Sequence, residues 1–219
     1  MINTESLIIN DISPIEINSR IGKLQQLFNQ LTYSHIPIFN EGTYLGCISE
    51  NDAHCFDEDK SINEISHIIE GFYVRKNKHW LDILETFVSN ETNILPVLDN
   101  DNVYIGYYEL KDVIQLFYDT PFLSKPGSIL VVEKGLQDFS FSEVGQIVES
   151  NNARLLGAFV SQINDNLVHI TMKIGISDLN EVLQTFRRYS YNIVTGHEED
   201  SFIANLKERS KYLDKYLNI

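Results

Sequence analysis

Residues 34–39 read SHIPIF, and residues 44–52 read YLGCISEND. The same pattern returns later in the chain, where residues 93–98 read NILPVL and residues 104–112 read YIGYYELKD. A proline, a glycine and an aspartate keep their order in the two copies: Pro37 with Pro96, Gly46 with Gly106, and Asp52 with Asp112. An internal repeat fixes the architecture, so the sequence predicts two copies of one small α/β unit, packed about a pseudo-two-fold axis.

Each copy contains the signals of a β-hairpin. The apolar run through the proline predicts a buried strand, with the proline at a strand start, a bulge or an edge because it cannot donate to a ladder. Polar turns at residues 40–43 and 99–102 lead into a second strand, which predicts a hairpin in each copy. The glycine inside the second strand predicts the close approach of another backbone or a ligand.

A helix is expected before each hairpin. Apolar residues fall at helical spacing in both copies: Ile21, Leu24, Leu27, Phe28 and Leu31 in the first, and Trp80, Leu81, Leu84, Phe87 and Val88 in the second. The aspartate that follows each hairpin is expected in the first turn of a further helix, where a carboxylate is favoured. The predicted unit is therefore strand, helix, strand, strand, helix.

The repeated pattern resembles the CBS domain, named after cystathionine beta-synthase, over roughly residues 1–120. It consists of apolar-Pro-apolar, a turn, apolar-Gly-apolar-apolar and then Ser/Thr-x-x-Asp. Two such domains in tandem form a CBS pair, or Bateman module. The resemblance implies a regulatory module that forms a homodimer through the pair and binds an adenine nucleotide or adenosyl ligand between its repeats.

The resemblance also implies two ligand clefts. In the predicted first cleft, the Ser/Thr-x-x-Asp motif of repeat 1 faces the residues before the proline of repeat 2, and its members are Ser49, Asp52, Phe72, Tyr73, Asn93, Ile94, Leu95 and Pro96. In the predicted second cleft, Asp112 and Glu109 face the equivalent residues of repeat 1, which are Ser34, His35, Ile36 and Pro37. The aspartate would accept the ribose hydroxyls, and the Ser/Thr hydroxyl would help to hold phosphate.

The second cleft departs from the family pattern because Glu109 replaces the hydroxyl residue. A carboxylate repels phosphate in a poorly solvated cleft, so we expect the first cleft to be the better nucleotide site. A structural alternative stays open at this point. Asp52 and Asp112 are also explained as helix N-terminal carboxylates, with Ser49 as a cap.

The rest of the chain predicts a second unit. The order is a strand at 129–132, a helix at 142–151, strands at 155–163 and 167–174, a helix opened by Asp178 and a strand at 192–194. This order is typical of a ferredoxin-like split βαβ fold, and after a CBS pair it resembles an ACT domain in a protein of the acetoin-utilisation type. The Asp-x-Pro-Gly ligand loop of ACT domains is missing: residues 125–127 precede the strand, and residues 134–138 follow it.

The predicted fold class is therefore α/β (α+β), with tandem CBS repeats, an ACT-like βαββαβ domain and a C-terminal helix. The expected boundaries are 1–61 for repeat 1, 62–122 for repeat 2, 126–199 for the ACT-like domain and 200–219 for the helix.

Composition and sequence motifs argue against several classes of function. A net charge of −14 and the lack of Lys/Arg clusters disfavour nucleic acid as a partner. The chain has no P-loop, His-Glu-x-x-His or Gly-x-Ser-x-Gly motif, so no catalytic residues are expected and the protein is not expected to be an enzyme. No metal site is expected, since the acidic stretch at residues 52–59 reads as a helix followed by a solvated loop. Without a signal segment or membrane-spanning run, we expect no membrane partner and a cytoplasmic location.

Two functions follow from these expectations. The first is a ligand sensor without a resident cofactor that binds AMP, ADP, ATP or S-adenosylmethionine and controls an unidentified protein partner. The second is an assembly module that has no small-molecule ligand.

Overall fold

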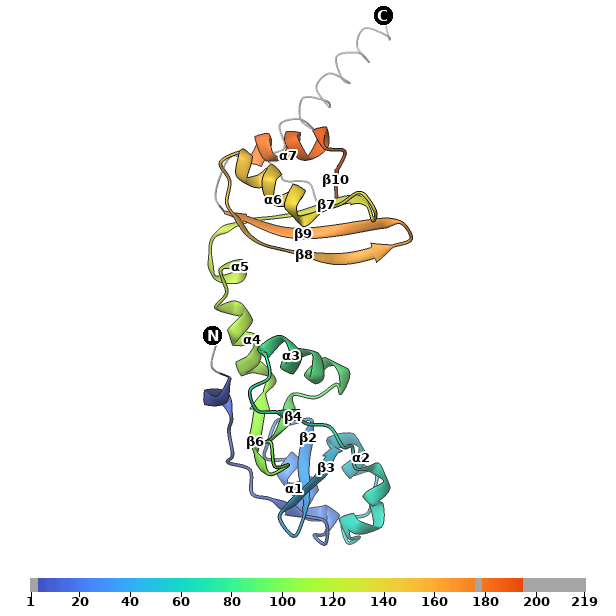
Figure 1. Ribbon diagram of the computed structural model, residues 1–219. Helices are drawn as coiled ribbons and strands as arrows, with labels where there is room; N and C mark the ends of the chain where they lie inside the picture. The colour runs from blue at the N-terminus through green and yellow to red at the C-terminus, as the bar shows by residue number, and fades with distance from the viewer. Residues whose placement is uncertain (1–3, 176–178, 195–219) are drawn as a thin grey trace, which may run out of the picture. The chain divides into compact units, whose positions relative to one another are not determined.

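The structure is a computed structural model that describes residues 4–175 and 179–194. The chain divides into two compact units, unit 1 at Met1–Phe117 and unit 2 at Tyr118–Ile219 (Figure 1). The C-terminal helix expected at 200–219 lies outside the described residues.

Unit 1 consists of two copies of the order predicted from the repeat. The first copy contains β1 (Ile15–Glu16), α1 (Ile21–Phe28), β2 (His35–Asn40), β3 (Thr43–Ser49) and α2 (Glu50–His54). The second contains β4 (Val74–Arg75), α3 (Trp80–Ser89), β5 (Ile94–Leu98), β6 (Tyr104–Glu109) and α4 (Leu110–Tyr118). Each copy has its own three-stranded sheet, in the orders β1-β2-β3 and β4-β5-β6. The predicted tandem architecture is therefore confirmed.

The two prolines lie in the middle strand of each sheet, at positions where no donor is needed. Pro37 pairs with Cys47 on β3, and the parallel pairing with β1 begins one residue later, at Ile38. Pro96 pairs with Tyr107, and the pairing with β4 begins at Val97. The missing N–H therefore removes no ladder hydrogen bond.

The helices α1 and α3 bury one face each, as their spacing predicts. Three side chains of each helix lie in the core of unit 1: Ile21, Leu24 and Phe28 from α1, and Trp80, Ile83 and Phe87 from α3. The sequence pattern was too inclusive, because Leu31 lies beyond the end of α1 and Leu81 and Val88 are 52% and 71% exposed.

The two repeated glycines allow a neighbouring backbone to cross the hairpin of each copy. A Cβ at Gly46 (φ +154°) would lie 2.6 Å from the carbonyl oxygen of Glu70, and one at Gly106 (φ +141°) would lie 2.3 Å from that of Ile9. Short β-bridges pair Cys47 with Glu70 and Tyr107 with Ile9. The segment before each repeat therefore crosses the hairpin of the other repeat, and the expectation of a close backbone approach is confirmed.

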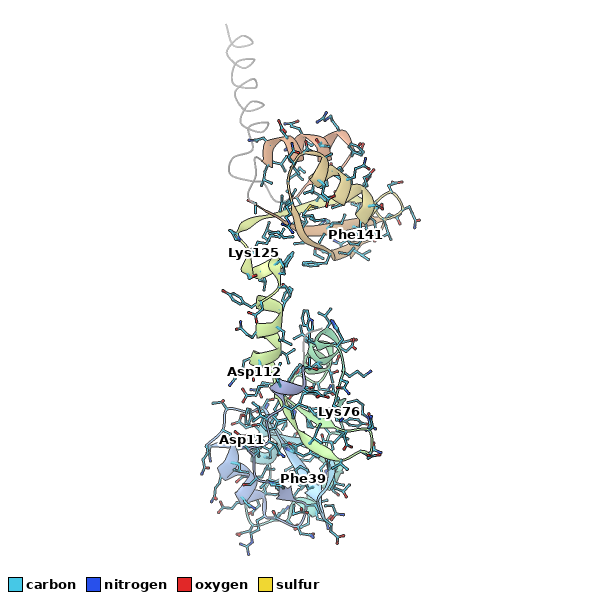
Figure 2. The ribbon with its side chains drawn as sticks, turned by 60° about the vertical axis from the view of Figure 1, so that its left-hand side comes forward. Asp11, Phe39, Lys76, Asp112, Lys125 and Phe141 are labelled. Atoms are coloured by element: carbon cyan, nitrogen blue, oxygen red, sulfur yellow. The ribbon has the colours of Figure 1, made fainter. Side chains whose placement is uncertain are left out.

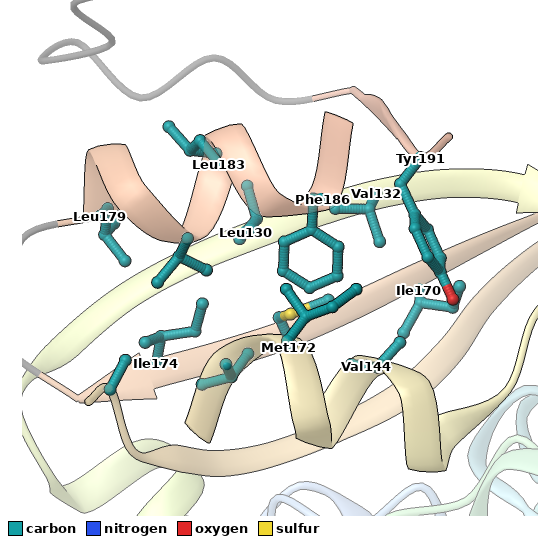
Figure 3. Packing of buried hydrophobic residues seen from close by; sticks show 14 of the residues in the cluster. Leu130, Val132, Val144, Ile170, Met172, Ile174, Leu179, Leu183, Phe186 and Tyr191 are labelled. Carbon is teal, nitrogen blue, oxygen red and sulfur yellow. The ribbon is translucent and has the colours of Figure 1, made fainter. Parts of the chain in front are cut away.

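Unit 2 has one four-stranded sheet with two helices on one face. Its elements are α5 (Pro121–Ser124), β7 (Gly127–Gly135), α6 (Phe141–Ser150), β8 (Leu155–Asn164), β9 (Leu167–Gly175), α7 (Leu179–Arg188) and β10 (Asn192–Ile193). The sheet order β10-β7-β9-β8, with α6 and α7 as crossovers, is the split βαβ arrangement. Figure 3 shows side chains of both helices, such as Val144 and Phe186, meeting Ile170 and Met172 of β9 in one core.

One strand of unit 2 is longer than the sequence predicts. β7 begins at Gly127 and ends at Gly135, because it pairs with β9 over the whole length from Gly127–Gly175 to Gly135–Leu167. Gly127 and Lys134 are therefore strand residues and not loop residues, and the turn that leads to α6 is shorter than expected.

Candidate functional site

The two repeats meet where the strands β2 and β5 begin. Ser34 and Asn93 precede these strands, and each accepts a hydrogen bond from the other's backbone. The Ser34 N–H donates to Asn93 Oδ1 at 2.8 Å, and the Asn93 N–H donates to Ser34 Oγ at 3.0 Å. These two reciprocal hydrogen bonds join the pseudo-symmetric repeats to each other. One cavity lies on each side of them.

The first cavity, called the Ser49 cavity here, has a volume of about 450 Å³. Residues of both repeats line it: Ser34, His35, Ser49, Glu50, Asn51, Glu70, Ser89, Asn90 and Glu91. Ser49 is the N-cap of α2, and its Oγ accepts from the Asp52 N–H at 3.1 Å while its hydroxyl donates to Asp52 Oδ2 at 2.7 Å. The capping alternative is therefore correct for Ser49, and the hydroxyl also lies at the wall of a cavity.

In the structure each motif lies opposite a residue of its own repeat, whereas the resemblance implied a pairing across the repeats. Ser49 faces His35 of its own repeat, because the hairpin places these two residues directly opposite each other on β3 and β2. In the second repeat Glu109 faces Ile94 in the same way. The register of each hairpin therefore brings Ser34 and His35 to the Ser49 cavity, and Asn93 to the other cavity.

Carboxylates dominate the charge of the Ser49 cavity. Glu50, Glu70 and Glu91 line it, and no lysine or arginine is among its described lining residues. They do not form a group that could hold a metal ion among residues 4–175 and 179–194. The cavity therefore carries a negative potential that opposes polyanions.

His35 is the titratable group in the wall of this cavity that is most deeply buried, with 6% of its surface exposed. Its Nδ1 lies 2.9 Å from Ser34 Oγ, its Nε2 lies 3.7 Å from Glu70 Oε1, and its ring meets that of Phe72 edge to face at 5.4 Å. Burial lowers the pKa of His35, and the nearby Glu70 carboxylate opposes this effect only in part. The side chain is therefore neutral near pH 7, with its ring held between a hydroxyl and a carboxylate.

The second cavity, called the Glu109 cavity here, has a volume of about 370 Å³. Its lining residues are Thr32, Tyr33, Asn93, Glu109, Leu110, Lys111 and Ile114. The Tyr33 hydroxyl donates to Glu109 Oε1 at 2.7 Å, and Lys111 forms an ion pair with Glu109 Oε2. Burial alone would raise the pKa of Glu109, but these two partners outweigh it and lower the pKa below its ordinary value. The carboxylate is thus ionised and already has partners.

A chain of hydroxyls extends this network into the core. Tyr33 Oη lies 3.0 Å from the hydroxyl of the fully buried Tyr107, which in turn donates to Asp11. The rings of Tyr33 and Tyr107 meet edge to face at 5.5 Å. Side chains of both repeats therefore take part in one hydrogen-bond network beside the Glu109 cavity.

The other predicted site residues have different positions. Ile36 and Pro37, and likewise Ile94, Leu95 and Pro96, are buried in the sheets and line neither cavity. Phe72 is buried and its ring meets that of His35. Tyr73 and Arg75 line a neighbouring hollow of about 650 Å³, which shares Ser89 and Asn90 with the Ser49 cavity. Asp52 and Asp112 are half-buried in the first turns of α2 and α4, beside the cavities and not among their lining residues.

Sequence reasoning missed several cavity residues that lie next to its motifs. Ser89, Asn90 and Glu91 lie at the C-terminal end of α3 and precede the second motif, and Thr32 and Tyr33 hold the equivalent place in repeat 1. The repeat itself carried the signal for them, because each segment immediately precedes the Ser34 or Asn93 contact between the repeats. Glu70 had a separate signal in the sequence. The glycine at position 46, inside a strand, predicts that another backbone passes close to it, and in the structure this backbone is that of Glu70.

Comparison with known proteins gives no family model that matches and no matching curated protein. Solved structures do match. One is a CBS domain pair/ACT domain protein from Thermotoga maritima, with 16% identity, a TM-score of 0.49, and coverage of 54% of this chain and 98% of that one. A second is CBSX2 in complex with AMP, with 14% identity, a TM-score of 0.45, and coverage of 52% and 95%.

A third match is the CBS domain of a bacterial CNNM/CorC family Mg²⁺ transporter in complex with ATP, with 18% identity, a TM-score of 0.43, and coverage of 52% and 84%. These three matches each extend over about half of this chain. Within the described residues, no helix has the length and apolar character needed to cross a membrane.

Proposed function

We propose that the tandem repeats are a regulatory, non-catalytic sensor that binds an adenine nucleotide or adenosyl ligand in the Ser49 cavity. The observation that carries this proposal is the cavity itself. It has about 450 Å³, it is lined by both repeats, and it lies beside a Ser-x-x-Asp motif. Cavities of this size are the usual sites of small ligands, and the polar side chains that line this one offer hydrogen-bond partners to a polar ligand.

Ser49 and Asp52 have separate parts in the proposed site. The Asp52 carboxylate accepts a hydrogen bond from the Ser49 hydroxyl and from no other described side chain, so it retains acceptor capacity for ribose hydroxyls. The Ser49 hydroxyl would turn from Asp52 to the ligand. His35, the cross-strand neighbour of Ser49, offers a neutral imidazole ring in the cavity wall, where it would orient a base or a sugar.

The charge of the cavity selects among the four candidate ligands. Three lining carboxylates repel each added phosphate, so affinity should fall from AMP to ADP to ATP when no divalent cation is present. S-adenosylmethionine carries a sulfonium and an ammonium and should bind most tightly. The Glu109 cavity should bind this cationic ligand more weakly than the Ser49 cavity, because Tyr33 and Lys111 already satisfy its carboxylate.

Regulation requires that the ligand bind two arrangements of the module with different affinity. The Ser49 cavity is suited to this role, because residues of both repeats line it, on either side of the Ser34–Asn93 contact. A ligand there would bias the relative position of the repeats and, through it, an unidentified protein partner.

Calorimetric titration with the four ligands tests the proposal. Saturable binding to the wild type, lost in Asp52→Ala and kept in Asp112→Ala, is the expected result. Asp112 is a matched control because it holds the same position in the first turn of α4. Binding lost in Asp112→Ala and kept in Asp52→Ala would assign the site to the Glu109 cavity. The absence of binding by all four would reject the sensor.

A second candidate function is an assembly module without a ligand, and exposed apolar side chains of unit 1 favour it. Leu81 and Val88 of α3 and Ile114 of α4 are 52%, 71% and 47% exposed. We propose that a second copy of the chain covers them in a homodimer of the tandem repeats. Sedimentation of the wild type as a dimer and of Val88→Glu as a monomer would support this; a wild-type monomer at micromolar concentration would reject it.

A further inference from the structure

Unit 2 contains a cavity that has no counterpart in the proposed nucleotide site. Its volume is about 340 Å³, and its lining residues are Pro121, Lys125, Pro126, Arg154, Leu156 and Gly175. It lies where β7 and β8 begin and β9 ends, since Gly127 pairs with Gly175 and Leu155 with Ile174. Figure 2 labels Lys125 on the segment that leads into β7. We call it the Lys125 cavity.

The Lys125 cavity combines apolar walls with two cations. Pro121, Pro126 and Leu156 supply the walls. The side chains of Lys125 and Arg154 are exposed, and neither forms a hydrogen bond or ion pair with another residue in the described ranges 4–175 and 179–194. In a chain of net charge −14, two such cations at one cavity form a local positive site.

We propose that the Lys125 cavity binds a small carboxylate with an apolar chain. Arg154 presents a planar guanidinium that can bind a carboxylate through two parallel hydrogen bonds, and Lys125 adds a second positive charge. The proline and leucine walls take the apolar chain of the ligand.

The same lining disfavours an amino acid. No aspartate or glutamate is among the lining residues that the structure describes, so an α-ammonium group would lie beside two cations without an anionic partner among those residues. The ligand class is therefore a simple carboxylic acid or a 2-oxo acid. The site also differs from the turn after β7, at the opposite end of that strand, where an ACT-type ligand loop would lie.

Gly175 gives this inference a precise probe. Among the described residues, a Cβ at Gly175 would have only Arg154 near it, with its Cβ and carbonyl oxygen both at 3.6 Å, and the backbone φ lies outside the left-handed region. A side chain is therefore allowed at this position, and Gly175 lines the cavity. Gly127 on the neighbouring strand differs, because a Cβ there would lie 2.3 Å from the Ile174 carbonyl oxygen.

Titration calorimetry of the full chain with three ligands of one shape tests the proposal: 4-methylpentanoate, its amide, and leucine. We expect saturable binding of 4-methylpentanoate, with affinity at least tenfold higher than that of the amide or of leucine. Arg154→Gln should weaken it at least tenfold, and Gly175→Val should abolish it. Lys23→Gln, which removes one exposed cation of unit 1, should leave it unchanged.

Three results would overturn the proposal. One is no saturable binding of 4-methylpentanoate, another is equal affinity for leucine or the amide, and the third is binding that survives Arg154→Gln. Near-UV circular dichroism checks that each variant is folded. If Gly175→Val does not fold, Arg154→Gln alone decides. The result is independent of the Ser49 cavity, since no residue is shared by the two sites.

Discussion

Ser34 and Asn93 hold equivalent positions in the two repeats, and each side chain accepts a hydrogen bond from the other's backbone N–H, at 3.0 Å and 2.8 Å respectively. Neither contact exists within a single repeat. The pair is thus a polar contact between the repeats, with Ser34 lining the Ser49 cavity and Asn93 lining the Glu109 cavity.

Removal of this contact should destabilise unit 1 in a non-additive way. Ser34→Ala and Asn93→Ala each leave a half-buried backbone N–H without its acceptor, so each should lower the free energy of unfolding by about 1–3 kcal/mol. The double variant should lose less than the sum of the two, because the partners contact each other directly. Urea unfolding of the four proteins measures the coupling, and strict additivity would show that the two bonds are independent.

The crossing segments predict which glycines tolerate alanine. Gly46→Ala and Gly106→Ala should each lower the free energy of unfolding by about 2 kcal/mol or more, since the new Cβ would overlap a carbonyl oxygen of Glu70 or Ile9. Gly71→Ala is the control, because a Cβ at Gly71 would have no atom within 4 Å. Equal melting temperatures for all three variants would contradict the crossing geometry.

His35 should make unit 1 less stable in mild acid. Burial holds its pKa below the ordinary value of 6.5, so the unfolded chain binds more protons than the folded one in the interval between the two pKa values. Stability is therefore complete above about pH 6.5 and falls as the pH decreases below it. The slope of unfolding free energy against pH should flatten in His35→Gln and stay unchanged in His67→Gln, which alters an exposed histidine.

Glu109 should contribute stability in a different pH range. Its folded-state pKa lies below the ordinary value of 4.5, so its contribution is complete above that pH and is lost as the pH falls through the lowered pKa. Glu109→Gln should therefore be less stable than the wild type at pH 7, and the difference should shrink in acid. If the difference in unfolding free energy between Glu109→Gln and the wild type stayed constant from pH 7 to acid, the ionised carboxylate would not be the group that stabilises unit 1.

Much of the architecture followed from the sequence, because a repeat of Pro37, Gly46 and Asp52 at Pro96, Gly106 and Asp112 states the same local fold twice. The helix faces were less certain. Leu81 and Val88 fit the spacing of α3 and yet are exposed, since spacing does not say how much of a helix another element covers.

The sequence motifs located the neighbourhood of the Ser49 cavity, but of the residues expected in the first cleft only Ser49 lines it. The motif named Ser49 and Asp52, but the hairpin register places Ser49 opposite His35 of the same repeat, which was not part of the reasoning from motifs. The hydrogen bond from Tyr33 to Glu109 joins segments that are distant in sequence, whereas Lys111, the other partner of Glu109, lies within the motif itself. The Tyr33 contact follows from the way the repeats pack and not from the sequence of either copy.

The most direct test of the central claim is amide hydrogen exchange of the full chain with and without saturating S-adenosylmethionine. The account predicts added protection at residues 34–35, 49–52 and 89–91, the segments that line the Ser49 cavity. Protection confined to residues 32–33 and 109–114, around the Glu109 cavity, or no change in exchange at the Ser49 segments, would contradict it.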